Sequence, residues 1–198
     1  MNFLAHLLLA GPPTAPDYVG LLVGQFIADS VPGRQFESYP PAVQAGIRLH
    51  RAIDTFTDQH PVVRRSTQRL REAGYGKYAG VVSDIFLDHF LAHNFREYSP
   101  ESLPAFTQRI YALLKTQQAL MPEHAQRTLH YMALHDWLSG YALLAGINRA
   151  LNGLSQRARP GSGMETAGEE LQRKYAAYEA DFREFFPELQ QLVESMLK

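Results

Sequence analysis

Apolar residues recur at intervals of three and four positions along almost the whole chain, and no run alternates between apolar and polar residues as a half-buried strand does. This spacing matches a helical turn, so each stretch is expected to bury one face. The pattern predicts an all-α fold, with helices at 2–10, 17–30, 41–58, 61–73, 77–97, 102–119, 123–138, 141–153, 166–185 and 187–197.

Helix-start signals agree with this pattern. Pro61 stands where proline suits a first helical turn, and Ser99-Pro100-Glu101 is typical of an N-cap followed by proline. Thr166 with Glu169 fits a capping box. These residues therefore predict where three of the helices begin.

The one strong loop signal lies near 156–168, where Pro160, Gly161 and Gly163 follow one another closely. We predict a mobile surface loop there, because the segment is too short to join two domains with a whole domain after it. Residues 1–198 are therefore expected to form a single helical domain.

Composition narrows the class of protein. The chain has 198 residues, of which 45% are hydrophobic and 20% charged, so intrinsic disorder is excluded for most of it. Its net charge of −1 offers no overall field for nucleic acid, and no nucleic-acid partner is expected. The absence of cysteine excludes disulfides, thiolate metal sites and cysteine nucleophiles.

Two apolar runs resemble targeting segments but lack their other features. The run 1–10 has no basic region and contains Asn2 and His6, unlike a signal peptide. The run 19–28 is interrupted by Gln25 and is far shorter than a membrane span. We therefore expect a cytoplasmic protein that does not associate with membranes.

Candidate chemistry begins with a histidine and an aspartate in the helix predicted at 41–58. At 100° per residue, His50 and Asp54 lie on the apolar half, one turn apart, with Asp58 at its edge. An imidazole and a carboxylate at this spacing can converge on one cation, although such a pair is also often a plain hydrogen bond.

The helix predicted at 77–97 carries ionisable residues within an almost continuous apolar surface. Asp84 and Asp88 share one face, and His89 and His93 share another. Burying several ionisable groups costs free energy unless they pair or ligate a metal. Asp84 also suits a cap or a pair with an arginine, and a buried histidine such as His93 is more often a hydrogen-bonded core residue.

Two further residues complete the candidate set. His6 interrupts an apolar helix, and Asp29 ends another. Inward-facing histidines and carboxylates without thiolates suit Mn²⁺, Mg²⁺, Fe or Zn²⁺ in a hydrolytic site. The candidates come from four helices and are His6, Asp29, His50, Asp54, Asp88 and His89.

Arginines crowd the segment after Pro61, and others face outward on the preceding helix. They form either a solvated helix face or a docking patch for an acidic partner, which a nearly neutral protein must build from localised charge. The residues are Arg48, Arg51, Arg64, Arg65, Arg69 and Arg71.

Six blocks of sequence, found in order over nearly the whole chain, resemble the bacterial acyl carrier protein phosphodiesterases (holo-ACP hydrolases). The blocks at 47–58 and 84–93 are the most specific. They read MNFLAHL at 1–7, GQFIAD at 24–29, GIRLHRAID at 46–54 with Thr57-Asp58, DIFLDHFL at 84–91, Trp137-Leu138 with Tyr141, and LNGLS at 151–155.

The resemblance implies an all-helical, HD-phosphohydrolase-like bundle that depends on a divalent cation, with Mn²⁺ favoured. The reaction that it implies is hydrolysis of the phosphodiester joining 4′-phosphopantetheine to a serine of holo-acyl carrier protein. The products are apo-carrier and 4′-phosphopantetheine. The matched positions coincide with the candidates from helical geometry, so one or two cations are expected on His6, Asp29, His50, Asp54, Asp88 and His89.

In this scheme Asp88 is central to catalysis, and Asp58 or His93 passes a proton to the leaving serine oxygen. Acyl carrier proteins are strongly acidic, so the expected docking residues are Arg48, Arg51, Arg64 and Arg65.

Two positions depart from the family pattern or from the HD signature. Leu8 stands where some members carry histidine, which excludes a ligand there. His135-Asp136 is the chain's only literal His-Asp dipeptide, but it lies outside the family's metal-site blocks, so we predict no metal role for it. Tyr131, Trp137 and Tyr141 are expected to pack or to form the wall of a pocket.

Two other functions stay open at the level of sequence. An HD-like hydrolase of small nucleotides would use the same ligands, although no glycine loop of the kind that cradles phosphate is present. A non-catalytic carrier-binding helical protein would keep the polar core as structure alone. The oligomeric state is also left open.

Overall fold

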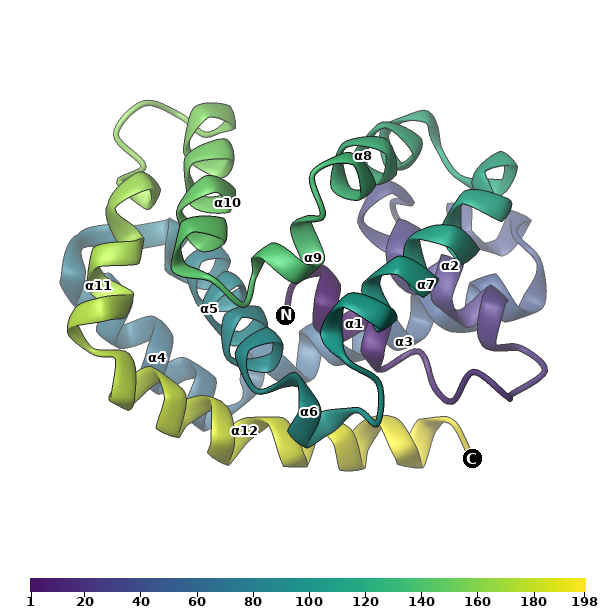
Figure 1. The fold of residues 1–198 in the computed structure, drawn as a ribbon, viewed down its shortest axis with the longest axis horizontal. Coiled ribbons are helices and arrows are strands. Elements are labelled where there is room, and N and C mark those ends of the chain that lie inside the picture. The colour runs from purple at the N-terminus through teal and green to yellow at the C-terminus, as the bar shows by residue number, and fades with distance from the viewer.

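Helices make up all the regular structure, and no strand forms. The computed structural model describes residues 1–198 (Figure 1). Its α-helices are α1 (Phe3–Leu8), α2 (Tyr18–Ile27), α3 (Pro41–Gln59), α4 (Pro61–Leu70), α5 (Ala79–His93), α6 (Phe95–Tyr98), α7 (Leu103–Thr116), α8 (Glu123–Leu134), α9 (Trp137–Gly140), α10 (Leu144–Arg157), α11 (Ala167–Arg173) and α12 (Tyr175–Met196). The all-α prediction is confirmed.

Short irregular turns join several of these helices. Five are 3₁₀ turns, and one turn of π type follows α4 at Arg71–Tyr75. The 3₁₀ turns lie at Ala28–Ser30, Gln35–Ser38, Gly76–Tyr78, Gln118–Leu120 and Met164–Thr166.

The core is organised around α5, which packs against α1, α4, α10 and α12. Its Phe86 and Phe90 are almost fully buried, as the apolar residues around its circumference predict. Long α12 runs along one side of the molecule beneath α4 and α6 in Figure 1. One continuous apolar core extends from Met1 to Val193, which agrees with a single domain. None of the helices has the length and apolar character that a membrane crossing needs.

Helices α2 and α3 touch backbone to backbone at two glycines. A Cβ atom added to Gly24 would lie 2.2 Å from the Val43 carbonyl oxygen, and one added to Gly46 would lie 2.3 Å from that of Leu21. No side chain fits in either place, so the sequence needs glycine at both to bring these helices together. This contact fixes where the candidate residues of α3 stand relative to α2.

Two predicted helix boundaries near the C-terminus are wrong. The expected break before Pro187 does not occur, because α12 continues through the proline, and the break falls at Lys174. Phe185, Phe186 and Leu189 are all fully buried around the proline. Their packing therefore sustains the helix where local propensity alone would end it.

The expected helix at 123–138 is also too long. Helix α8 ends at Leu134, because Asp136 adopts a left-handed backbone conformation with φ of 44°. The Asp136 side chain then accepts a hydrogen bond from the Ser139 N–H and begins α9. The only His-Asp dipeptide of the chain is thus a turn between two helices.

Of the three residues or motifs predicted to begin helices, only Pro61 does so as predicted. Helix α4 does begin at Pro61, but Ser102 rather than Ser99 caps α7, by accepting from the Ala105 N–H. Thr166 forms no capping box, since its hydroxyl donates to the Gly163 carbonyl. The predicted loop at 156–168 shortens to 158–163, because α10 continues to Arg157 and a 3₁₀ turn begins at Met164.

Candidate metal centre

Two histidines from different helices meet face to face inside the protein. His6 of α1 and His50 of α3 stack with ring centroids 3.8 Å apart and planes 12° from parallel. Both are nearly fully buried. The chain thus places two imidazoles side by side, one from a six-residue helix and one from the helix fixed by the glycine contact.

A shared carboxylate joins the two rings. Asp54, one turn after His50 on α3, lies 3.1 Å from His6 Nε2 through Oδ1 and 3.1 Å from His50 Nε2 through Oδ2. Asp29, in the 3₁₀ turn after α2, approaches His50 Nε2 at 3.3 Å. We call His6, His50, Asp54 and Asp29 the histidine cluster.

One residue orients both imidazoles from behind. Gln25 of α2 lies 3.1 Å from His6 Nδ1 through its side-chain oxygen and 2.9 Å from His50 Nδ1 through its backbone carbonyl. When each Nδ1 donates its proton to Gln25, each Nε2 is directed toward Asp54 and can bind a cation once it carries no proton. Metal-binding histidines are held in this way by an oxygen behind the ring.

The charges within the cluster are uneven. Burial lowers the pKa of His6 to about 4, so this ring is neutral near pH 7. For His50 burial acts in the same direction, but the carboxylates of Asp29 and Asp54 outweigh it and raise the pKa to about 9. The imidazoles in turn hold the pKa of Asp54 well below its usual range despite its burial. The carboxylates are therefore ionised and attract a cation.

The cluster fits a divalent cation on the evidence of one atom. His50 Nε2 is buried and lies within 3.3 Å of two carboxylates, but neither contact has the geometry of a well-formed hydrogen bond. Ligand atoms of His6, His50 and Asp54 all lie within 4.8 Å of one another. Two imidazoles and carboxylate oxygens suit Mn²⁺, Fe²⁺ or Zn²⁺.

Solvent reaches the cluster from the carboxylate side. The Asp54 side chain is 40% exposed and that of Asp29 is 79% exposed, whereas both imidazoles lie beneath them. Asp84 of α5 borders the same place, since the Met1 amino group lies 3.0 Å from Asp84 and 3.7 Å from Asp54. The carboxylate side of the cluster is therefore open to solvent, whereas the imidazole side is closed.

Asp88 lies outside the histidine cluster, with a different set of partners. Its fully buried carboxylate accepts from the backbone N–H groups of Asn2, Leu4 and Ala5, at the start of α1. Burial raises the pKa of Asp88 to about 7, against the effect of these donors. Asp88 thus fixes the start of the helix that carries His6, and both of its oxygens already accept from backbone N–H groups.

The structure places His89 and His93 at a separate location. His89 Nδ1 lies 2.8 Å from the Tyr141 carbonyl oxygen, and its Nε2 lies 3.1 Å from the Tyr175 hydroxyl. Burial lowers its pKa. Both ring nitrogens of His89 therefore have protein partners, and the exposed His93 stacks at its edge.

The four predicted docking arginines differ in their exposure and in the partners of their guanidinium groups. Arg65 bonds Asp181 and Glu184 of α12, and Arg51 donates to two backbone carbonyl oxygens after α2. Arg48 and Arg64 are exposed and form no ion pair. Asp58, on α3 one turn after Asp54, is also exposed.

Arg65 belongs to a second buried polar group, which we call the arginine cluster. Asp181 of α12 accepts hydrogen bonds from Arg65, Arg69 and Ser66 of α4. The Asp181 side chain is only 5% exposed. This cluster joins α4 to α12.

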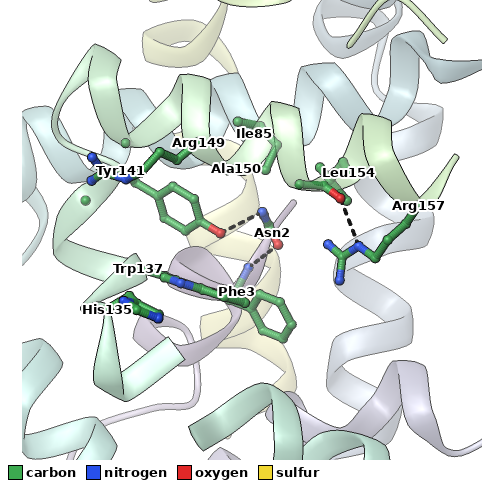
Figure 2. Close-up of a pocket in the computed structure, with 13 residues that line it drawn as sticks. Asn2, Phe3, Ile85, His135, Trp137, Tyr141, Arg149, Ala150, Leu154 and Arg157 are labelled. Atoms are coloured by element: carbon green, nitrogen blue, oxygen red, sulfur yellow. Dashed lines mark hydrogen bonds between the residues drawn. The ribbon is translucent and has the colours of Figure 1, made fainter. Parts of the chain in front are cut away.

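A cavity of about 580 Å³ opens beside α1, between α5, α9 and α10 (Figure 2). Its lining includes His135, but Asp136 instead accepts from the Tyr111 hydroxyl and the Ser139 N–H. Trp137 and Tyr141 form part of its wall, as the sequence suggested. The other polar and aromatic residues that line the cavity are Asn2, Phe3, Arg149 and Arg157.

Sequence reasoning missed Gln25 as a site residue. The signal was present, because Gln25 interrupts the otherwise apolar run at 19–28. A lone amide in such a helix must find hydrogen-bond partners when it is buried. Its partners turned out to be the two histidines.

Comparisons with known proteins agree over the full length. The family model for acyl carrier protein phosphodiesterase matches residues 1–189. A protein named acyl carrier protein phosphodiesterase from Photorhabdus laumondii is 35% identical over 98% of this chain and 96% of its own length. Proteins of the same name from Serratia proteamaculans and Escherichia coli O6:H1 are 33% and 34% identical, each over 96% of this chain and 96% and 95% of their own lengths.

No solved structure matches the chain. The HD-like relationship therefore stays a prediction from resemblance, whereas the sequence matches cover nearly every residue. The chain belongs to the acyl carrier protein phosphodiesterase family, which is named for a phosphoric diester hydrolase.

Proposed function

We propose that this protein is a divalent-cation-dependent phosphodiesterase that removes 4′-phosphopantetheine from the serine of holo-acyl carrier protein. The observation that carries the proposal is the histidine cluster, with its unbonded His50 Nε2, in a member of this family. Water adds to phosphorus, the bond from phosphorus to the serine oxygen breaks, and a proton passes to that oxygen. The products are apo-carrier and 4′-phosphopantetheine.

The residues that would hold the cation are His6, His50 and Asp54, with Asp29 beside His50. Mn²⁺ suits this set of imidazoles and carboxylates. Mg²⁺ or another divalent cation could also bind, although Mg²⁺ prefers sites with oxygen ligands alone. When bound, the cation would neutralise charge on the phosphodiester and make water more acidic.

The remaining residues orient and exchange protons. Gln25 fixes the rotation of both imidazoles, and Asp88 holds the start of α1 so that His6 faces Asp54. Asp58 is better placed than His93 to give the serine oxygen a proton. It is exposed one turn beyond Asp54, whereas His93 lies next to His89, whose ring nitrogens bond Tyr141 and Tyr175.

Docking of the acidic carrier is assigned to the exposed arginines without ion pairs. Arg48 and Arg64 lie on α3 and α4, the helices on either side of His60, and neither is neutralised by a carboxylate. Long-range attraction to an acidic surface would raise the rate of encounter. Arg65 would contribute less because Asp181 and Glu184 already pair with its charge, and Arg51 because it is half-buried and donates to two backbone carbonyl oxygens.

The experiment that tests the function is a mass measurement on the carrier. Metal-stripped protein is incubated with holo-acyl carrier protein, with and without Mn²⁺. We expect the carrier to lose the mass of phosphopantetheine only when the cation is present. If folded protein removes no such mass with any divalent cation, the proposal is wrong, and free nucleotides become the next substrates to assay.

A further inference from the structure

The cavity beside α1 plays no part in the chemistry described so far, yet it adjoins the histidine cluster along the chain. The Met1 amino group contacts Asp84 and Asp54, and the next residue, Asn2, lines the cavity. Ile85, which follows Asp84 on α5, lines it as well. One end of the cavity is therefore a single residue away from the carboxylates at the cluster.

The walls combine aromatic surface with a few polar groups. Figure 2 shows Asn2 near the middle, with Tyr141 and Trp137 on one side of it and Arg157 on the other. The Asn2 amide donates to the Tyr141 hydroxyl at 3.1 Å, and Phe3 adds a second apolar ring. Mostly apolar walls with few polar groups, at this volume, are typical of small-molecule sites.

The charge of the lining is positive. Arg149 and Arg157 line the cavity from α10, and neither forms an ion pair. No aspartate or glutamate is among the lining residues. The cavity therefore suits a ligand that is partly apolar, offers amide or hydroxyl groups and carries negative charge at one end.

We propose that this cavity holds the pantetheine arm of the carrier substrate while the phosphodiester lies at the histidine cluster. The arm has a dimethyl-substituted carbon, a hydroxyl, two amides and a terminal thiol beyond its phosphate, which matches apolar walls with an amide and a phenol at the centre. The inference rests on the proposed function, because that function supplies the arm. A nucleotide fits less well, since no carboxylate is available to bind its ribose hydroxyls.

Trp137 makes the inference testable without turnover, because it is the only tryptophan of the chain and lies in the cavity wall. Pantetheine, which has no phosphodiester to cleave, is titrated into the intact protein while tryptophan fluorescence is followed. We expect a saturable change. 4′-Phosphopantetheine should give the same change at lower concentration when Mn²⁺ is present, because its phosphate would reach the histidine cluster while the arm occupies the cavity.

Gly153→Leu tests the location. Gly153 lines the cavity, and a Cβ atom added to it meets no atom within 4 Å, so the new side chain enters empty space. Leucine should not disturb α10, since it favours a helix more than glycine does. We expect it to weaken pantetheine binding by about tenfold or more through steric exclusion. Asn152→Leu places the same side chain on the exposed neighbouring position, outside the cavity, and should bind as the wild type does.

The outcomes separate this inference from the proposed function. If pantetheine gives no saturable change, or binds Gly153→Leu as well as wild type, the arm does not occupy the cavity, even where holo-carrier is still cleaved. A response to AMP in place of pantetheine would also overturn it. If pantetheine binds as expected but holo-carrier is never cleaved, the cavity assignment stands and the proposed reaction fails.

Discussion

The histidine cluster and the arginine cluster each hold a carboxylate between basic side chains, but Asp54 is 40% exposed and Asp181 only 5%, and different groups neutralise them. Asp181 accepts from two arginines and a serine, all of which are permanent donors near neutral pH. Asp54 instead lies between two imidazoles, one of which is neutral, and His50 Nε2 has no hydrogen bond.

The two clusters differ in whether every polar atom has a hydrogen-bond partner within the protein. In the arginine cluster every Asp181 oxygen has a hydrogen-bond donor, so the group is complete and joins α4 to α12. In the histidine cluster the charge of Asp54 and Asp29 is balanced by groups that can give up a proton or move, which are His50 and the Met1 amino group, so a cation can take their place. Single substitutions in each cluster test this distinction.

Replacing Asp54 with asparagine should have the largest effect. Asp54→Asn keeps the size of the side chain but removes the charge that both imidazoles face. We expect turnover of holo-carrier to fall by about 10³-fold, with the helical circular dichroism unchanged. The stabilisation of the protein by Mn²⁺ in a thermal melt should also disappear. Substantial turnover in this variant would assign the cation to other residues.

Gln25→Met should weaken the same site without removing a ligand. The side-chain oxygen behind His6 is lost, while the backbone carbonyl behind His50 remains. We expect Mn²⁺ affinity, measured by titration calorimetry, to fall by about 10- to 100-fold. Gln25→Glu keeps an acceptor behind His6 and should recover part of the affinity. Equal loss in both variants would mean that orientation of the ring is not the cause.

The matching change in the arginine cluster should affect stability and leave chemistry intact. Asp181→Asn removes the charge that Arg65 and Arg69 pair with. We expect the free energy of unfolding in urea to fall by about 2 kcal/mol, as for other hydrogen bonds to charged groups. Turnover measured below the unfolding transition should match the wild type. A loss of activity comparable to that of Asp54→Asn would erase the contrast between the clusters.

The contribution of Asp181 to the free energy of unfolding should depend on pH. Ser66, Arg69 and Arg65 outweigh the effect of burial and hold the pKa of Asp181 below its ordinary value of 3.8. A carboxyl whose pKa is lowered by folding stabilises the protein above its unfolded pKa, and this contribution is lost as the pH falls through the folded pKa. The difference in unfolding free energy between wild type and Asp181→Asn should therefore be constant near pH 6 and shrink below pH 3.8.

The smallest effect is expected at the surface between the clusters. Arg64→Glu and Arg65→Glu reverse neighbouring charges on α4, but only Arg65 pairs with Asp181. We expect Arg64→Glu to raise KM for holo-carrier about threefold at low salt, with stability within about 0.5 kcal/mol of the wild type. Arg65→Glu should mainly lower the unfolding midpoint. An unchanged KM for Arg64→Glu at low salt would place carrier docking elsewhere.

The sequence predicted the parts of the site that depend on a single helix. His50 and Asp54 lie one turn apart on α3, so helical geometry alone aligned them, and His6 stood out in an apolar run. The fold class followed in the same way from periodicity. Boundaries at Pro187 and Leu134 did not, because buried phenylalanines sustain one helix and a left-handed Asp136 ends the other.

What depended on the partner element was not predictable. Asp88 and His89 are adjacent on α5, and the sequence could not show that one meets the backbone of α1 while the other meets Tyr141 and Tyr175. Both satisfied the condition that a buried ionisable group needs a partner. A peptide N–H, a carbonyl and a phenol met that condition equally well. All three come from residues distant in sequence, so the spacing of apolar and polar residues on α5 could not reveal them.

The glycine contact between α2 and α3 has a consequence for ion selectivity. With Gly24 and Gly46 leaving the two backbones in contact, the Gln25 carbonyl and the His50 ring cannot separate without pulling two helices apart. A coordination shell of fixed size discriminates ions by radius, since it neither contracts around a small ion nor expands around a large one. For the cation that we propose, Gly24 and Gly46 would therefore help to set which ionic radius the site accepts.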